Sequence, residues 1–82
     1  MYAYFYRGTA LGQLGKIQDA IADLRKAIAL KSDYPNAWFN LALMLDKTGD
    51  VKGAYEAAKK AKGMNFSIEE KYYASLEQRA KQ

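Results

Sequence analysis

"PNAWFNLALMLDKTGDVKGAYEAAKKAKG", residues 35–63, contains two apolar patterns with helical spacing, one on each side of Gly49. Residues three and four positions apart share one face of a helix. The residues at these spacings are Trp38, Leu41, Ala42 and Leu45 in the first half, and Val51, Ala54, Tyr55, Ala58 and Ala61 in the second. Pro35 suits a first helical turn, and Gly49 suits the left-handed residue that ends a helix. The stretch therefore predicts an antiparallel pair of helices near residues 35–47 and 51–62.

The same pattern occurs once earlier in the chain, displaced by 34 residues without a gap. The identical pairs at this displacement are Ala3/Ala37, Phe5/Phe39, Leu11/Leu45, Gly15/Gly49, Ala20/Ala54, Lys26/Lys60 and Ala27/Ala61. Self-similarity at a fixed period of this length is typical of helical repeat proteins. We therefore predict two further helices, near residues 2–14 and 17–30, which form an equivalent hairpin.

A fifth helix is predicted from the final segment, "NFSIEEKYYASLEQRAKQ". Ser67 followed by Glu70 matches a capping box, in which each side chain bonds the backbone of the other residue at a helix start. This pattern places the helix near residues 68–81, and Gly63 is expected to help end the helix before it. Tyr72 is expected to bury its ring. The polar residues Gln78, Arg79 and Lys81 are expected to face solvent.

These spacings resemble the tetratricopeptide repeat, whose pattern is W-x2-L-G-x2-Y, then A-x3-F, then P. The second unit carries Trp38, Leu41, Ala42, Leu45, Gly49, Ala54 and Ala61 in the family's positions, and the first carries Tyr4, Gly8, Leu11, Gly15, Ala20, Leu24 and Ala27. Arg7 stands where the family has Leu, and neither unit has the closing Pro. The resemblance implies an all-α superhelix in one domain, residues 1–82. It would consist of repeats 1–34 and 35–68 and a capping helix, 68–81.

The resemblance also implies a binding face, because the first helix of each repeat in this family lines the concave side of the superhelix. The residues carried over are Tyr2, Phe5, Tyr6, Thr9 and Gln13, then Asn36, Phe39, Asn40, Leu43 and Lys47, then Glu70 and Tyr73. This face is aromatic and neutral-polar, which suits an extended peptide or a partner helix. The family's clamp for a C-terminal carboxylate is not expected, because Phe5 and Thr9 occupy its Lys and Asn positions.

Self-association is the alternative function. Repeat arrays need about three repeats with polar caps for stability, whereas this chain has two repeats and a cap after them. We expect its first helix to expose apolar surface, including Tyr2 and Tyr6. Exposed apolar patches of this kind mark interaction surfaces. A second copy of the chain could therefore dock there.

The amino-acid composition excludes several classes of function. The chain has 82 residues and contains no Cys and no His, which excludes disulfides and thiolate catalysis and leaves little basis for a zinc site. No apolar run reaches the roughly 18 residues of a membrane span, and the N-terminus lacks a signal-peptide pattern. We expect no cofactor and no catalytic activity. A soluble protein, with the cytoplasm as the default compartment, is the resulting expectation.

The charged residues do not form a predicted site. The net charge is +4, and the two signs are interspersed, so we do not expect a nucleic-acid partner. Four lysines on the fourth helix are expected to be solvated, with binding to polyanions as the weaker alternative: Lys52, Lys59, Lys60 and Lys62. Asp46 and Asp50 are interpreted as turn and cap residues. Asp19 and Asp23 are placed on an outer face, where Arg25 and Lys26 balance them.

Overall fold

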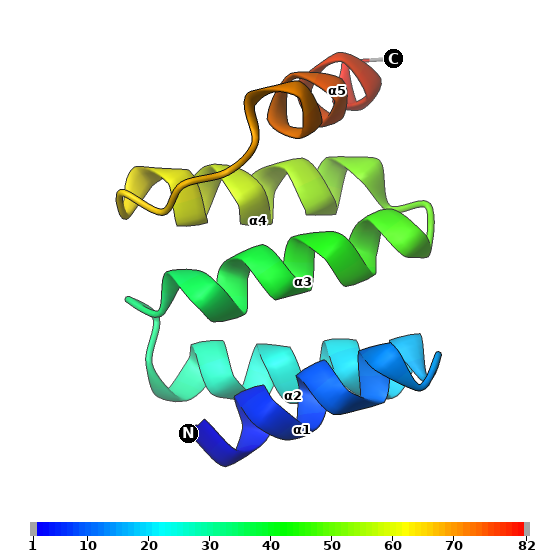
Figure 1. Ribbon diagram of the computed structural model, residues 1–82, viewed down its shortest axis with the longest axis vertical. Helices are drawn as coiled ribbons and strands as arrows, with labels where there is room; N and C mark the ends of the chain where they lie inside the picture. The colour runs from blue at the N-terminus through cyan, green and yellow to red at the C-terminus, as the bar shows by residue number, and fades with distance from the viewer. Residues whose placement is uncertain (1, 82) are drawn as a thin grey trace.

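Five α-helices follow one another along residues 2–81, the part of the chain that the computed structural model describes. They are α1 (Tyr2–Gln13), α2 (Ile17–Leu30), α3 (Pro35–Lys47), α4 (Val51–Gly63) and α5 (Glu70–Ala80). Figure 1 shows α1 beside α2, α3 between α2 and α4, and α5 at the far end of the stack over α4. The all-helical fold and its two successive hairpins confirm the predicted architecture.

Two glycines end helices as the sequence predicts. Gly15 and Gly49 have φ angles of 84° and 89°, in the left-handed region that glycine enters without steric cost. After each glycine, a backbone N–H bonds back across the last turn of the helix: Lys16 to the Leu11 carbonyl at 2.9 Å and Asp50 to the Leu45 carbonyl at 3.0 Å. These are Schellman motifs. They turn the chain sharply, so that each pair of helices packs antiparallel.

Helix α4 ends at Gly63, which was expected to help end it. Gly63 is the last helical residue, and Asn65 takes the left-handed conformation instead, with φ of 64°. The N–H of Phe66 bonds the Ala61 carbonyl at 3.2 Å, which completes the same motif. Asparagine tolerates this conformation better than most residues other than glycine, so Asn65 can serve as the left-handed residue after the helix.

The predicted capping box at Ser67 and Glu70 is wrong. Helix α5 begins at Glu70, and the preceding residue, Glu69, has an extended backbone and makes no side-chain cap bond. Ile68 is half-buried and packs against the hydrophobic core. The chain therefore stays extended until Ile68 has packed, and the helix starts two residues later than expected.

Small residues let the helices of each hairpin approach closely. Leu24 of α2 is completely buried, and an added Cβ on Gly8 of α1 would lie 3.0 Å from its Cγ atom. In the second hairpin, Ala42 and Ala58 are completely buried. Leu76 of α5 is also completely buried and joins the same core. Alanine and glycine at the crossings and leucine between them thus form one continuous core.

Arg7 and Asp23 form an ion pair that the sequence pattern does not predict. The guanidinium donates from Nε to Oδ2 at 2.6 Å and from Nη2 to Oδ1 at 2.8 Å. Asp23 is only 6% exposed, so its predicted place on an outer face is wrong. The hydrogen bonds from Arg7 hold the pKa of Asp23 below its usual value. The pair also accounts for an arginine where the repeat pattern has leucine, because a leucine would leave this buried carboxylate without its cation.

Candidate functional site

Helices α1 and α3 come together along one face of the molecule. The Nδ2 of Asn40 donates to Oγ1 of Thr9 at 3.0 Å, and Thr9 in turn donates to the Phe5 carbonyl at 2.9 Å. One turn further on, Met44 packs against Gly12, where an added Cβ would lie 2.8 Å from the Met44 sulfur. A hydrogen bond and a close apolar contact therefore fix α3 against α1.

A pocket of about 250 Å³ opens in this junction. We call it the α1–α3 groove; its lining residues are Gly8, Thr9, Gly12, Gln13, Leu24, Asn40, Leu43, Met44 and Lys47. Leucine and methionine side chains supply its apolar surface, while amide, hydroxyl and ammonium groups supply its polar surface. Small-molecule sites in proteins usually have about 300–1,000 Å³. The groove is therefore suited in size to one large side chain rather than to a whole cofactor.

Five of the predicted face residues meet in the α1–α3 groove: Thr9, Gln13, Asn40, Leu43 and Lys47. The other lining residues were not predicted as site residues. Gly12 and Met44 face each other across the helix junction. The sequence signal for this contact was Gly12 itself, a second small residue one helical turn after Gly8 on the same face of α1. Small residues on one helix face allow a neighbouring helix to come close.

Three further predicted residues gather at the other end of α1. Tyr2 packs edge-to-face on Tyr34 with ring centroids 5.5 Å apart, and Phe5 lies 4.9 Å from the same ring. Phe5 also contacts Tyr6 at 5.4 Å. We call Tyr2, Phe5, Tyr6 and Tyr34 the tyrosine cluster. Burial raises the pKa of Tyr34. Tyr34 was missed because it lies in the loop before Pro35, and only the folded hairpins bring it to α1.

The same repeats are found when the chain is compared with known proteins. A family model described as "TPR repeat" matches residues 8–49, and one described as "Tetratricopeptide repeat" matches residues 35–67. The chain belongs to the tetratricopeptide-repeat family. An uncharacterized protein of Methanocaldococcus jannaschii is 33% identical over 66 residues, which make up 80% of this chain and 72% of that protein. No solved structure matches the chain.

Tetratricopeptide repeats generally mediate protein–protein interaction and are typically non-catalytic. Within residues 2–81, no three acidic side chains are grouped so that they could hold a metal ion. None of the five helices described has the length and apolar character needed to cross a bilayer. The α1–α3 groove and the tyrosine cluster are thus the features of this tetratricopeptide repeat that most resemble a binding surface.

The part of the predicted face at Phe39 is already occupied. Phe39 is half-buried against Phe66 of the α4–α5 loop, with ring centroids 5.3 Å apart, and against Tyr72 of α5 at 6.4 Å. Asn36, by contrast, is exposed in the first turn of α3. The loop and α5 therefore cover the part of the concave side that Phe39 contributes.

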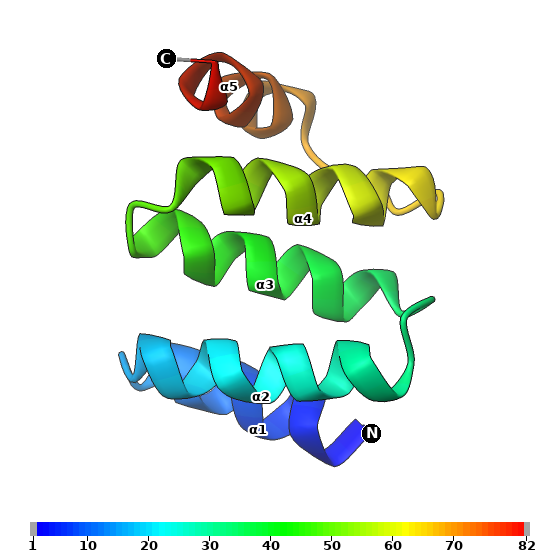
Figure 2. The same ribbon diagram turned by 180° about the vertical axis from the view of Figure 1, so that it is seen from behind.

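The predicted position of Tyr73 is wrong. Its ring packs on Tyr55 of α4 with centroids 5.7 Å apart, and the Lys62 ammonium lies 4.1 Å from the ring centroid. Tyr73 therefore faces α4 and lies apart from the α1–α3 groove. The cause is the orientation of α5, which is seen almost end-on in Figures 1 and 2 while α4 lies across the view. The capping helix of this tetratricopeptide repeat crosses α4 instead of continuing the row of α1 and α3.

Polar side chains fix α5 in this orientation. Arg79 donates to both carboxylate oxygens of Asp46, at 2.9 and 3.2 Å, and the Tyr72 hydroxyl donates to Oδ2 of the same carboxylate at 3.1 Å. Arg79 therefore contacts α3 while it stays exposed, as predicted. The hydrogen bond from Arg79 lowers the pKa of Asp46. Burial, together with the negative charge of Asp46, raises the pKa of Tyr72 to about 12.

A second polar contact joins α5 to α4. The hydroxyl of Tyr55 donates to Oε2 of Glu77 at 3.0 Å. This hydrogen bond, with a further contribution from Tyr73, raises the pKa of Tyr55 to about 12.

Asp50, as predicted, caps α4: its carboxylate accepts a hydrogen bond from the Gly53 N–H at 3.0 Å.

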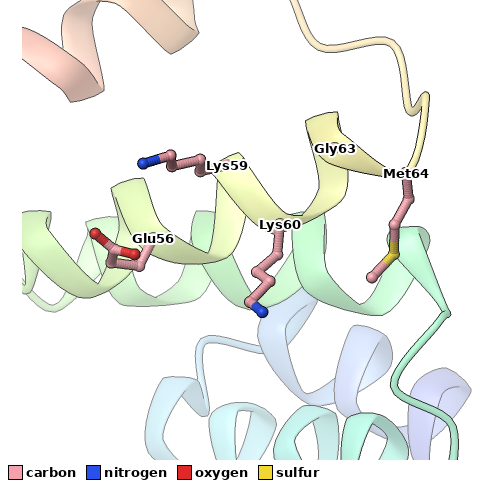
Figure 3. Close-up of a pocket in the computed structure, with 5 residues that line it drawn as sticks. All are labelled: Glu56, Lys59, Lys60, Gly63 and Met64. Carbon is pink, nitrogen blue, oxygen red and sulfur yellow. The ribbon is translucent and has the colours of Figure 1, made fainter.

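Two of the four lysines of α4, Lys59 and Lys60, border a shallow hollow of about 430 Å³, shown in Figure 3. Its lining residues are Glu56, Lys59, Lys60, Gly63 and Met64, all from α4 or its end. In Figure 3, Lys59 and Lys60 leave opposite sides of the helix and do not converge. The Lys60 ammonium lies 5.9 Å from the centroid of the Trp38 ring, and Glu56 adds a negative charge. This arrangement favours the solvated face predicted for these lysines over an anion site.

Proposed function

We propose that this tetratricopeptide repeat binds an extended peptide or a partner helix in the α1–α3 groove. The observation that carries the proposal is the meeting of five predicted residues from two separate helices around one pocket of about 250 Å³. A pocket of this size accepts one large apolar side chain of the ligand. The ligand's backbone would then lie along the two helices.

The polar residues of the groove give the ligand an orientation. Asn40 donates through Nδ2 to Thr9, which holds the amide group in place and directs Oδ1 away from this contact. A fixed side-chain carbonyl accepts a hydrogen bond from a peptide N–H. Gln13 and Lys47 are exposed at the groove's edge and are suited to ligand carbonyl groups. The groove therefore combines an apolar anchor point with backbone recognition.

The tyrosine cluster extends this surface along α1. Tyr2 and Tyr6 are 53% and 66% exposed, so a ligand can bury a large part of each ring. Burying one aromatic or aliphatic side chain contributes roughly 1.5–3 kcal/mol. Two or three such contacts give an affinity in the micromolar range after the costs of association. The chemistry of the surface favours a neutral or apolar segment as ligand.

Peptides selected on the immobilised chain from a random display library test the proposal. Leu43→Gln places a polar group in the groove, and we expect it to weaken binding of a selected peptide by about tenfold or more. Leu30→Gln is the matched control, because Leu30 is 61% exposed at the end of α2 and lies outside the groove. Equal affinities for the two variants, measured by fluorescence polarisation, would exclude the groove as the binding site.

Self-association through α1 is a second candidate function, favoured by the exposure of Tyr2 and Tyr6. Large exposed rings close together are an aggregation liability on a monomer unless a partner covers them. Sedimentation equilibrium over a concentration series tests this function. A mass that rises with concentration supports it, and a monomer mass at all concentrations excludes it. Both candidate functions use Tyr2 and Tyr6 of α1, whereas the α1–α3 groove is used by peptide binding alone.

A further inference from the structure

Helix α3 has a face that is dedicated to the hairpin before it. Asn40 bonds to Thr9 of α1, and Met44 packs against Gly12 of α1. Ala37 and Leu41, on the same side of α3, are 0% and 4% exposed. These four residues form the side of α3 through which Asn40 and Met44 contact the repeat before it.

Helix α1 carries the equivalent face, and it is uncovered within residues 2–81. The residues 34 positions earlier are Ala3, Tyr6, Arg7 and Ala10, which we call the open face. All four are exposed; Tyr6 is 66% exposed and the Arg7 side chain is 67% exposed. The internal repeat thus shows that this side of a first helix is built for helix packing, and α1 presents it to solvent.

We propose that two copies of the chain pair through their open faces in a closed, two-fold symmetric dimer. The proposal rests on the second candidate function and specifies its interface. With the two-fold axis perpendicular to α1, the two α1 helices run antiparallel, and each position meets its complement on the other copy. Centring the two-fold axis between Tyr6 and Arg7 places Ala3 opposite the partner's Ala10 and Arg7 beside the partner's Tyr6.

Side-chain size and charge suit this register. Ala3 and Ala10 have short side chains, so the two helices can cross closely where these residues meet. The Arg7 guanidinium is paired with Asp23 on its own chain, which offsets the repulsion between two arginines near the axis. Placed over the partner's Tyr6, the guanidinium also gains the attraction between a cation and an aromatic ring. The open face is therefore complementary to itself.

The other end of the molecule does not offer a matching surface. Helix α5 covers the last hairpin, and its exposed residues are Glu70, Lys71, Ala74, Ser75, Gln78 and Arg79, most of them polar. Arg79 is held by Asp46. A head-to-tail contact would place the alanines and the tyrosine of the open face on this largely polar helix. It would continue as a filament, since heterologous contacts do not close unless they form a ring. The two open faces are thus the surfaces that fit each other.

Sedimentation equilibrium of matched variants tests the interface. Ala10→Arg adds a charge to the open face, and we expect it to raise the dimer dissociation constant at least about 100-fold, since like charges brought together across an interface are strongly unfavourable. Ala74→Arg adds the same group to the exposed side of α5, and we expect no change. Both positions are exposed, so circular dichroism is expected to show intact folding. A dimer weakened by Ala74→Arg would instead indicate a head-to-tail contact.

Disulfide trapping tests the register, because the chain has no native cysteine. Under mild oxidation, we expect a mixture of Ala3→Cys and Ala10→Cys single variants to give a mixed disulfide-linked dimer. We expect each variant alone to crosslink far less, since the two-fold axis separates identical positions. Efficient crosslinking of either variant alone would overturn the register.

The outcomes separate this proposal from the broader ones. A chain that stays monomeric at all concentrations excludes self-association and this dimer together, while peptide binding in the α1–α3 groove is unaffected. A dimer that Ala10→Arg does not weaken preserves self-association and excludes the open face as its interface.

Discussion

Replacing Gly8 by alanine tests how closely α1 approaches α2 beneath the α1–α3 groove. A Cβ at this position would lie 3.0 Å from Cγ of Leu24, and 3.2 Å from both the carbonyl oxygen of Ala20 and Cβ of Asp23. Carbon atoms in favourable contact are about 3.5–4.0 Å apart. Leu24 is completely buried and the Ala20 oxygen belongs to the helix backbone, so neither can move aside freely. The added methyl group therefore forces α1 away from α2.

The size of the effect follows from two opposing contributions. Overpacking a core costs about 1–3 kcal/mol, whereas alanine in place of glycine inside a helix gains about 1 kcal/mol. We expect Gly8→Ala to lower the free energy of unfolding by about 1 kcal/mol, and by about 2 kcal/mol at most. For a domain of this size, each kcal/mol lowers the melting temperature by about 4–8 °C.

Gly63→Ala provides the control, because nothing lies within 4 Å of a Cβ added at the end of α4. This variant gains the higher helix propensity of alanine without the overpacking penalty, so we expect it to be as stable as the wild type or slightly more stable. Urea denaturation followed by circular dichroism measures both variants. If Gly8→Ala is as stable as Gly63→Ala, the close packing of α1 on α2 is not real, and the geometry of the groove built on it is incorrect.

Three further predictions concern the polar contacts. Arg7 lowers the pKa of Asp23 in the folded chain. The ion pair therefore stabilises the fold above the unfolded carboxyl pKa of about 3.9, and this stability is lost as pH falls through the lowered pKa. Arg7→Met is expected to make the loss of stability with falling pH less steep in acid unfolding curves. Spectrophotometric titration is expected to show Tyr72 ionising near its pKa of about 12, and Asp46→Asn is expected to lower that pKa because it removes the negative charge. Asp50→Ala removes the cap of α4 and is expected to cost about 1 kcal/mol in urea denaturation, whereas an unchanged midpoint would show that the cap contributes nothing.

The fold was accessible from the sequence because it depends on a local pattern that occurs twice. The apolar spacing identified the helices, and Gly15 and Gly49 fixed the turns through a conformation that other residues rarely adopt. The start of α5 was predicted incorrectly because the capping box is a local pattern, whereas packing of Ile68 against the core is a tertiary contact. That contact determined where the helix begins.

The candidate site was predictable only where it depends on repeat register. Thr9 and Asn40 occupy positions whose contact follows from one hairpin stacking on the next, and the structure brings them together. Tyr73 was misplaced because register alone assumes that α5 stacks as α3 does. The contacts of Asp46 with Arg79 and Tyr72 hold α5 in a different orientation. These contacts do not follow from the repeat register, so a single sequence gives no signal for them.

Amide chemical shifts, followed while a selected peptide is titrated into the chain, provide the most direct test of the central claim. If the α1–α3 groove is the binding site, the largest changes are expected along the two facing helices, at Thr9, Asn40 and Leu43, with small changes in α2. Changes concentrated on α2 and on the exposed side of α4, with Thr9 and Asn40 unaffected, would contradict the account.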